Sequence, residues 1–207
     1  RLMICHYQRF SRRHERIREW LEQGKLGRPV SARINFSSTS PPIGDPWRYQ
    51  RAIAGGGPIM DLGSHCLDLL MYLLGPIESA AVLKGNLAWP AEVEDTATML
   101  LKFANGTQAT VTTHWSARQP DDAARSHLEI WGTEGSVAAW PLFSKDHSGT
   151  LLFHGENGTE DHSCGPLGKV HEDVIEHFRQ AIVTGGPVRV PAEEALAGLR
   201  ILQSPGA

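Results

Sequence analysis

Apolar and polar residues alternate through the middle of the chain, and this alternation predicts β-strands. In the run from residue 30 to 37, one face holds the apolar side chains Val30, Ala32, Ile34 and Phe36. Similar runs predict strands near residues 79–87, 93–103, 107–116, 127–132, 136–140 and 150–155. Asn105-Gly106 lies between two of these runs and is a strong hairpin signal. Successive hairpins favour a mainly antiparallel sheet with one covered face and one more polar face.

Apolar residues that recur every three or four positions predict helices on either side of these strands. We expect one helix from Ser11 to about Gln23, a second from Lys169 to Thr184 and a third that begins near Pro191. The second helix should turn these side chains inward: Val170, Val174, Ile175, Phe178 and Ile182. Three further segments are interpreted as a short strand at 2–7, a long irregular loop at 37–54 and a mobile Gly-rich stretch at 156–168.

The segment from Gly55 to Gly75, GGGPIMDLGSHCLDLLMYLLG, predicts the helix around which the chain is organised. Its three glycines allow a close approach of backbone or ligand, and Pro58 suits a first helical turn. At about 100° per residue, one stripe of the helix carries the side chains Asp61, His65, Asp68 and Tyr72. The other positions are mostly apolar, so the helix should be largely buried. Ionisable groups on such a helix must be paired or must face a cavity.

Asp61 and His65 form the candidate catalytic pair. A histidine with a near-neutral pKa can take a proton from a substrate hydroxyl, and a neighbouring carboxylate can hold its tautomer. Taken singly, an aspartate at a helix start also balances the helix dipole, and a half-buried histidine is also a common core residue. Their combination behind a glycine run favours the functional interpretation. The pair could instead bind a metal, but one helix supplies only two ligands and no convincing set completes them.

Trp47 and Arg48 in the predicted loop are candidate contacts for a ligand. A tryptophan and an arginine together can stack on and clamp an anionic or sugar ligand. The alternative is that Trp47 only pins the loop to the core.

Composition narrows the class of protein. Of the 207 residues, 41% are hydrophobic and 21% are charged, and the net charge of -3 makes nucleic acid a poor partner. No apolar run reaches the ~18 residues of a membrane span, and no signal-peptide pattern opens the chain. The cysteines Cys5, Cys66 and Cys164 lack metal-type spacing and suit a reducing compartment. We therefore expect a cytoplasmic protein without nucleic-acid or membrane partners.

Several motifs together resemble the second domain of the glucose–fructose oxidoreductase / inositol dehydrogenase (Gfo/Idh/MocA-type) family. The specific one is the pattern GGG-x3-D-x-G-x-H-x2-D-x4-L-x-G at 55–75. Weaker similarities lie in YQRF at 7–10, EQGKLGRPV at 22–30, PWR at 46–48, and in the segments at 94–95, 103–106 and 130–136. The resemblance covers almost the whole chain.

This resemblance implies a single α+β domain over residues 1–207, with an open, mainly antiparallel β-sheet and helices packed on one face. It also implies an oxidoreductase that uses NAD or NADP and transfers a hydride from or to a sugar, polyol or related hydroxy compound. By motif, His65 matches the family's general acid/base and Asp61 its orienting partner. Arg9, Trp47 and Arg48 match positions near substrate and cofactor. The family's open sheet face implies a homo-oligomer, and no metal is implied.

The resemblance also implies a part that this chain lacks. The family's N-terminal Rossmann domain, with its Gly-rich loop and its Glu-Lys-Pro lysine, is absent, and no G-x-G-x-x-G or P-loop replaces it. The start at Arg1 and the ending Ser204-Pro205-Gly206-Ala207 suggest a piece of a longer protein. We therefore expect the isolated chain to be inactive and the cofactor to be bound mainly by the missing domain. A non-catalytic ligand-binding or oligomerisation module and a metal-dependent hydrolase or isomerase are the rival hypotheses.

Overall fold

The computed structural model describes residues 1–39, 46–120 and 125–203. Residues 40–45 of the predicted loop and the predicted helix-breaking residues 204–207 lie outside this described part.

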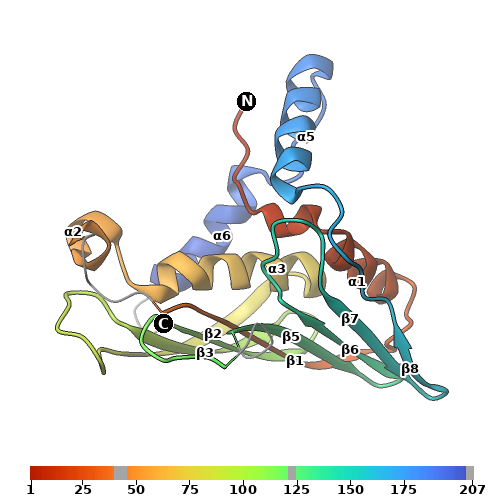
Figure 1. The fold of residues 1–207 in the computed structure, drawn as a ribbon, viewed down its shortest axis with the longest axis horizontal. Coiled ribbons are helices and arrows are strands. Elements are labelled where there is room, and N and C mark those ends of the chain that lie inside the picture. The colour runs from red at the N-terminus through yellow and green to blue at the C-terminus, as the bar shows by residue number, and fades with distance from the viewer. Residues whose placement is uncertain (40–45, 121–124, 204–207) are drawn as a thin grey trace.

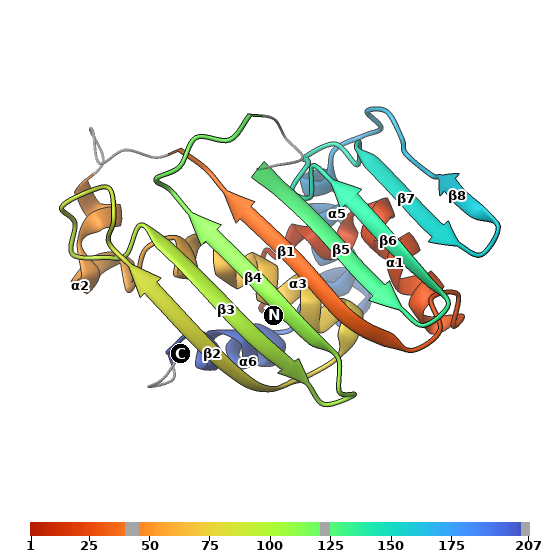
Figure 2. The ribbon, with the colours of Figure 1, turned by 90° about the horizontal axis from the view of Figure 1, so that it is seen from below.

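The described strands form one open sheet in the order β2-β3-β4-β1-β5-β6-β7-β8, seen from its uncovered face in Figure 2. Its strands are β1 (Pro29–Ser37), β2 (Ile77–Gly85), β3 (Thr96–Phe103), β4 (Gln108–His114), β5 (Ser126–Gly132), β6 (Gly135–Trp140), β7 (Thr150–Gly155) and β8 (Gly158–Asp161). Strands β1 and β4 pair in parallel, and the other neighbouring strands pair in antiparallel fashion. The prediction of a mainly antiparallel, open sheet is confirmed.

Helices cover the opposite face of this sheet (Figure 1). They are α1 (Arg12–Glu22), α2 (Arg51–Ala54), α3 (Ser64–Leu74), α5 (Val170–Thr184) and α6 (Ala192–Gln203), with the 3-10 turns η1 (Tyr7–Phe10) and η2 (Pro46–Tyr49) and the π-helical turn η3 (Ile59–Gly63). Helices α1 and α3 lie along the sheet, whereas α5 projects away from it. The α+β class with helices packed on one face is therefore confirmed. Among the described helices, none combines the length and the apolar character that a membrane crossing requires.

The main core lies between the sheet and the helices α1 and α3. Ile34, Val111 and Leu128 lie next to one another across β1, β4 and β5, and all three are fully buried. Ile17 of α1 and Leu70 of α3 are buried from the helical side. Each such side chain contributes about 1.5–3 kcal/mol by leaving water. A one-residue slip of a strand would expose its whole apolar set, so the alternation in the sequence sets the register.

Three predictions of local structure were wrong. Residues 2–6 form no strand, and a 3-10 turn follows at 7–10. Met3 and Ile4 instead pack against α5 and Val190, because a short apolar run does not distinguish a strand from another buried segment. The Gly-rich stretch contains β8, which forms a hairpin with β7. In α5, Ile175 and Ile182 are exposed rather than inward, because most of this helix extends beyond the sheet.

The three glycines before α3 allow the backbone to fold tightly against the loop that leads into β3. Gly55 has a φ of +78°, which is the left-handed conformation that glycine adopts most easily. At Gly57, an added Cβ would lie 1.8 Å from the carbonyl oxygen of Glu94. The buried Glu94 carboxylate accepts the N–H groups of Gly57 at 2.8 Å and of Ile59 at 3.3 Å. Glu94 therefore satisfies two N–H groups at the start of this helical segment.

Alanine substitutions should separate the need for a left-handed backbone at Gly55 from the need for close packing at Gly57. Gly57→Ala should lower the free energy of unfolding by about 3 kcal/mol or more, because the new methyl group overlaps main-chain atoms. Gly55→Ala should cost about 1–2 kcal/mol through its left-handed backbone alone. Urea unfolding followed by circular dichroism measures both. Gly165→Ala, which meets no atom within 4 Å, is the control. Equal stability of the Gly57 and Gly165 variants would contradict the proposed packing.

Candidate functional site

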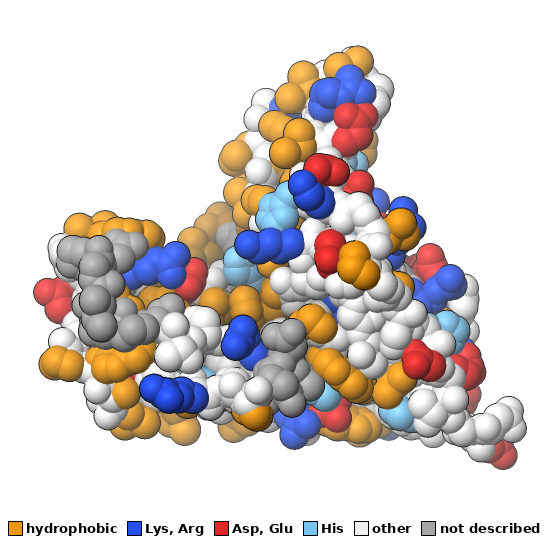
Figure 3. Space-filling view, in the orientation of Figure 1, with side chains coloured by type: hydrophobic (Ala, Val, Ile, Leu, Met, Phe, Trp, Pro, Cys, Tyr) orange, Lys and Arg blue, Asp and Glu red, His pale blue; other side chains and the backbone are white. Residues whose placement is uncertain are grey.

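The polar stripe predicted on the central helix is divided between two groups of residues. The first turn is the π-helix η3, in which hydrogen bonds span one more residue than in an α-helix. Asp61 lies in this turn and pairs with Arg48 of η2. His65 and Asp68 follow in α3 and contact the segment around η1. In Figure 3 the surface above α3 is hollowed between the region of α2 and the projecting α5.

The first group joins His65 to His6. The two Nδ1 atoms are 3.5 Å apart, and the rings meet edge to face with centroids 5.3 Å apart. The Nε2 atom of His6 lies 4.0 Å from a carboxylate oxygen of Asp68. Burial, and then the charge of His6, lowers the pKa of His65, while Asp61 and Asp68 act in the opposite direction. A lowered pKa keeps this imidazole neutral near pH 7, which is the form that accepts a proton.

Tyr7 lies beside the same imidazole. Its ring is 5.9 Å from that of His65 and is stacked on His171 at 4.4 Å. Burial raises the pKa of Tyr7 above its usual value, so its hydroxyl remains protonated at neutral pH. Tyr7 and His65 therefore present two neutral rings to each other near pH 7.

Arg9, which the sequence analysis placed near substrate, lies in a buried ion pair. Its Nε donates to one oxygen of Asp68 at 3.1 Å, and its Nη2 donates to the other at 2.6 Å. Its Nη1 donates to Glu194 of α6. Burial alone would lower the pKa of Arg9, but the hydrogen bonds and charges of Asp68 and Glu194 raise it. A direct contact between Arg9 and substrate stays a prediction.

The second group contains the other predicted site residues. The Asp61 carboxylate lies 3.6 Å from Nη1 of Arg48, and both side chains are 40% exposed. The guanidinium of Arg48 lies 5.5 Å from the ring centre of Trp47, which is itself exposed. A small cavity of about 200 Å³ is lined by Trp47, Arg48, Ala54, Gly56, Met60, Asp61 and Trp115. Trp47, Arg48 and Asp61 are thus brought together, while His65 lies outside the lining of this cavity.

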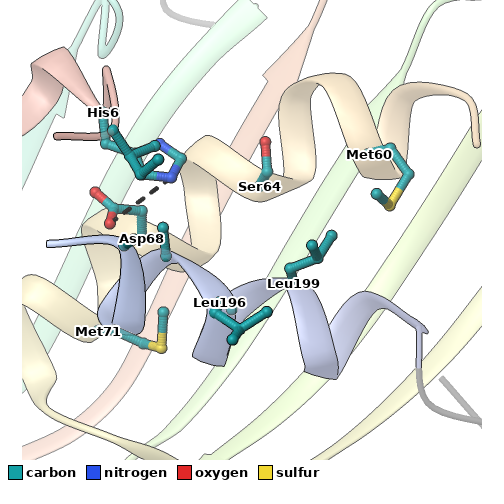
Figure 4. A pocket seen from close by; sticks show the side chains of 11 residues that line it. His6, Met60, Ser64, Asp68, Met71, Leu196 and Leu199 are labelled. Atoms are coloured by element: carbon teal, nitrogen blue, oxygen red, sulfur yellow. Dashed lines mark ion pairs between the residues drawn. The ribbon is translucent and has the colours of Figure 1, made fainter. Parts of the chain in front are cut away.

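A larger cavity of about 480 Å³ lies between α3, α6 and the opening segment. Figure 4 shows His6 and Asp68 at one end, Ser64 in its middle and Met60 at the other end. Apolar side chains that include Met71, Leu196 and Leu199 form the rest of the lining. The His6–Asp68 contact therefore borders a cavity large enough for a small organic ligand. Within the described ranges, no three His, Cys, Asp or Glu side chains are grouped so that they could hold a metal ion.

Sequence patterns alone did not identify His6 and Glu94 as residues of this site. His6 was interpreted as part of a strand, and its contact with a residue 59 positions away leaves no local pattern. Glu94 was noted only for its resemblance to a strand segment, but its buried carboxylate holds the start of the central helical segment. Because Glu92 and Asp95 are equally acidic neighbours, no local signal distinguishes Glu94 in the sequence.

Comparisons with known proteins agree on the fold. The model of the GFO/IDH/MocA C-terminal domain matches residues 14–138. A 1,5-anhydro-D-fructose reductase from Ensifer adhaerens is 26% identical over 94% of this chain and 57% of its own length. D-xylose 1-dehydrogenase [NADP(+)] from Haloarcula marismortui is 24% identical over 98% of this chain and 56% of its own length. This chain therefore spans little more than half the length of these two relatives.

A solved structure has the same fold. The aldose-aldose oxidoreductase from Caulobacter crescentus, complexed with glycerol, superposes with a TM-score of 0.83 at 25% sequence identity. The match covers 98% of this chain and 59% of the other. The similarity thus extends over almost every element described above.

Removal of the Asp68 charge should destabilise the chain strongly. Asp68→Asn leaves a buried guanidinium without its two-point partner, so the free energy of unfolding should fall by about 3–5 kcal/mol. Glu194→Gln should cost less than about 1 kcal/mol, because that partner is half exposed. Chemical unfolding of both variants at pH 7 gives the comparison. Losses of equal size would contradict the assignment of Asp68 as the main partner of Arg9.

Proposed function

Because the chain belongs to the GFO/IDH/MocA C-terminal domain family, we propose that it forms the substrate-binding and catalytic half of an NAD(P)-dependent oxidoreductase. The substrate is a sugar, a polyol or a related hydroxy compound. The names of the two relatives support this class, since one is a sugar-derivative reductase and the other an NADP-linked sugar dehydrogenase. In this proposal a Rossmann domain outside residues 1–207 binds most of the NAD or NADP. The length of the relatives supports such a second part.

The observation that carries the proposal is the environment of His65. Its imidazole is held neutral by burial, and its Nδ1 faces a second polar ring, His6, which lines the larger cavity. A neutral imidazole can accept the hydroxyl proton of an alcohol and return it to a carbonyl in the reverse direction. When it is bound, the nicotinamide supplies or accepts the hydride.

The residues that line the small cavity suit a hydroxylated substrate better than a nucleotide. Trp47 offers an exposed ring face to a sugar, and Arg48 offers hydrogen-bond donors beside it. Asp61 contributes negative charge, which favours the protonated form of His65. The chain contains no Gly-rich dinucleotide motif for a pyrophosphate. We therefore assign to this chain only contacts with the substrate and the reacting end of the cofactor.

Arg9 has a positioning role in this proposal. Its ion pair with Asp68 and its hydrogen bond to Glu194 tie η1, α3 and α6 together around the larger cavity.

The cysteines Cys5, Cys66 and Cys164 are free thiols, which supports a reducing compartment such as the cytoplasm.

The uncovered sheet face supports a homo-oligomer. Leu83, Leu100 and Trp131 project from β2, β3 and β5 on this face, and all three are exposed. Leu83 and Leu100 lie on the neighbouring strands β2 and β3, and adjacent exposed apolar side chains on an open surface often mark a protein interface. A second copy of the chain packed here would also serve the alternative function, a ligand-binding or oligomerisation module without catalysis.

Replacement of His65 tests the catalytic proposal. In the protein that joins this chain to a nucleotide-binding domain, His65→Ala should lower kcat/KM for the best substrate by roughly 10²- to 10⁴-fold. Turnover is followed by NAD(P)H absorbance with a panel of sugars and polyols. His154→Ala on β7, the strand next to the sheet edge, is the matched control and should retain activity. The isolated 207-residue chain should show no turnover. Full activity of the His65 variant would support the non-catalytic module instead.

A charge on the uncovered sheet face tests the oligomer. Leu100→Lys should weaken self-association at least about 10-fold, because a lysine there must lose its hydration in the interface. Sedimentation equilibrium measures the dissociation constant. Ile182→Lys introduces the same charge at an exposed apolar position on α5 and should leave the dissociation constant unchanged. A wild-type chain that sediments as a monomer at all concentrations would refute this interface.

A further inference from the structure

We propose that His6 and Asp68 set the tautomer of His65, so that the proton of the neutral ring lies on Nδ1 and the lone pair of Nε2 is free. The inference rests on the proposed function, because it identifies which nitrogen of the general acid/base receives the substrate proton. His6 and Asp68 are positioning residues in this arrangement.

The first step is the fixed orientation of Asp68. The carboxylate is almost fully buried, and Arg9 donates to both of its oxygens. A two-point pair with a guanidinium fixes both the plane and the position of a carboxylate. Asp68 therefore presents a carboxylate oxygen of fixed position, Oδ1, to His6.

The second step is the tautomer of His6. Its Nε2 is the ring nitrogen directed at Asp68, at 4.0 Å from Oδ1, as the dashed line in Figure 4 shows. Burial and the charge of Arg9 lower the pKa of His6 more than Asp68 raises it, so the ring is neutral near pH 7. A neutral imidazole has one N–H, and the nearby negative charge favours that hydrogen on Nε2. The Nδ1 of His6 is then an acceptor.

The third step is the contact between the two rings. The Nδ1 atoms of His6 and His65 are 3.5 Å apart, and two lone pairs facing each other at this distance would repel. Because Nδ1 of His6 accepts, Nδ1 of His65 must donate, and Nε2 of His65 is left unprotonated. A substrate hydroxyl then transfers its proton to this Nε2. The resulting imidazolium keeps its Nδ1 hydrogen bond to His6, so no second proton moves.

Packing of the rings without a directing hydrogen bond predicts a different tautomer of His65. The edge-to-face contacts of His65 with His6, Tyr7 and Phe143 need no particular tautomer. A neutral histidine without a directing partner prefers the hydrogen on Nε2. The two explanations therefore predict opposite protonation of the same ring.

Long-range ¹H–¹⁵N NMR of the 207-residue chain, at a pH above the titration of both rings, distinguishes them. We expect the pattern of the Nδ1–H tautomer for His65 and that of the Nε2–H tautomer for His6. A wild-type His65 that is mainly Nε2–H would overturn the proposal without any variant.

Two substitutions at His6 add a matched comparison. His6→Phe keeps an edge-to-face ring but removes the acceptor, so His65 should become mainly Nε2–H. His6→Asn can place an amide oxygen near the position of Nδ1 and should restore the Nδ1–H tautomer. Unchanged Nδ1–H in the phenylalanine variant would show that His6 does not direct it. Thermal unfolding by circular dichroism confirms that both variants are folded.

Kinetics of the enzyme that contains both domains separate this inference from the proposed function. His6→Phe should lower kcat on the order of 10-fold, because most His65 rings then hold the wrong tautomer, and His6→Asn should recover most of the loss. If His65 carries Nδ1–H and the His65→Ala enzyme is fully active, the proposed function is wrong and the tautomer assignment is still supported. If the His65→Ala enzyme is inactive but wild-type His65 carries Nε2–H, only the tautomer assignment is wrong.

Discussion

The buried ion pair between Arg9 and Asp68 is the interaction on which the arrangement of the site depends. It joins η1, near the start of the chain, to the middle of α3, 59 residues later, and Arg9 reaches on to α6. Two charges removed from water cost several kcal/mol each, and their attraction offsets this cost only in good geometry. Such a pair adds little net stability compared with an apolar core, but it has few alternative arrangements. Its contribution is therefore the relative position of three segments, and through them of His6.

The sheet and the helical layer have separate roles in this molecule. The sheet buries its alternating apolar side chains against α1 and α3 and holds α3 in place from below. The polar groups lie on the other side of α3, where they meet η1, η2 and α6. Because close packing fixes the helix on one side, modest polar contacts on the other side are enough to orient the imidazole.

The sequence predicted the parts of the fold that depend on local pattern. Strand alternation at residues 30–37 and the apolar positions of α3 follow from burial of one face, which is a local property of the chain. The start of the chain was misread because its short apolar run pairs with α5 and Val190, far away in sequence. Candidate site residues on α3 were readable from spacing. His6 was not, because only the folded chain brings it to His65.

The different roles of Asp61 and Asp68 near His65 also follow from the folded chain. Helical spacing places Asp61 one turn before His65, and a triad-like interpretation would make it the orienting carboxylate. In the structure the carboxylate of Asp61 pairs with Arg48 across the small cavity, while Asp68 lies behind His6. Asp61 is half exposed, whereas Asp68 is buried; both raise the pKa of His65 through their charge, and in our proposal Asp68 acts in addition through the ring of His6. A charge at a distance alters how readily the ring is protonated, but only a directed contact selects which nitrogen is protonated. For this reason the carboxylate that orients His65 in our proposal is the one that the helix places behind a second histidine.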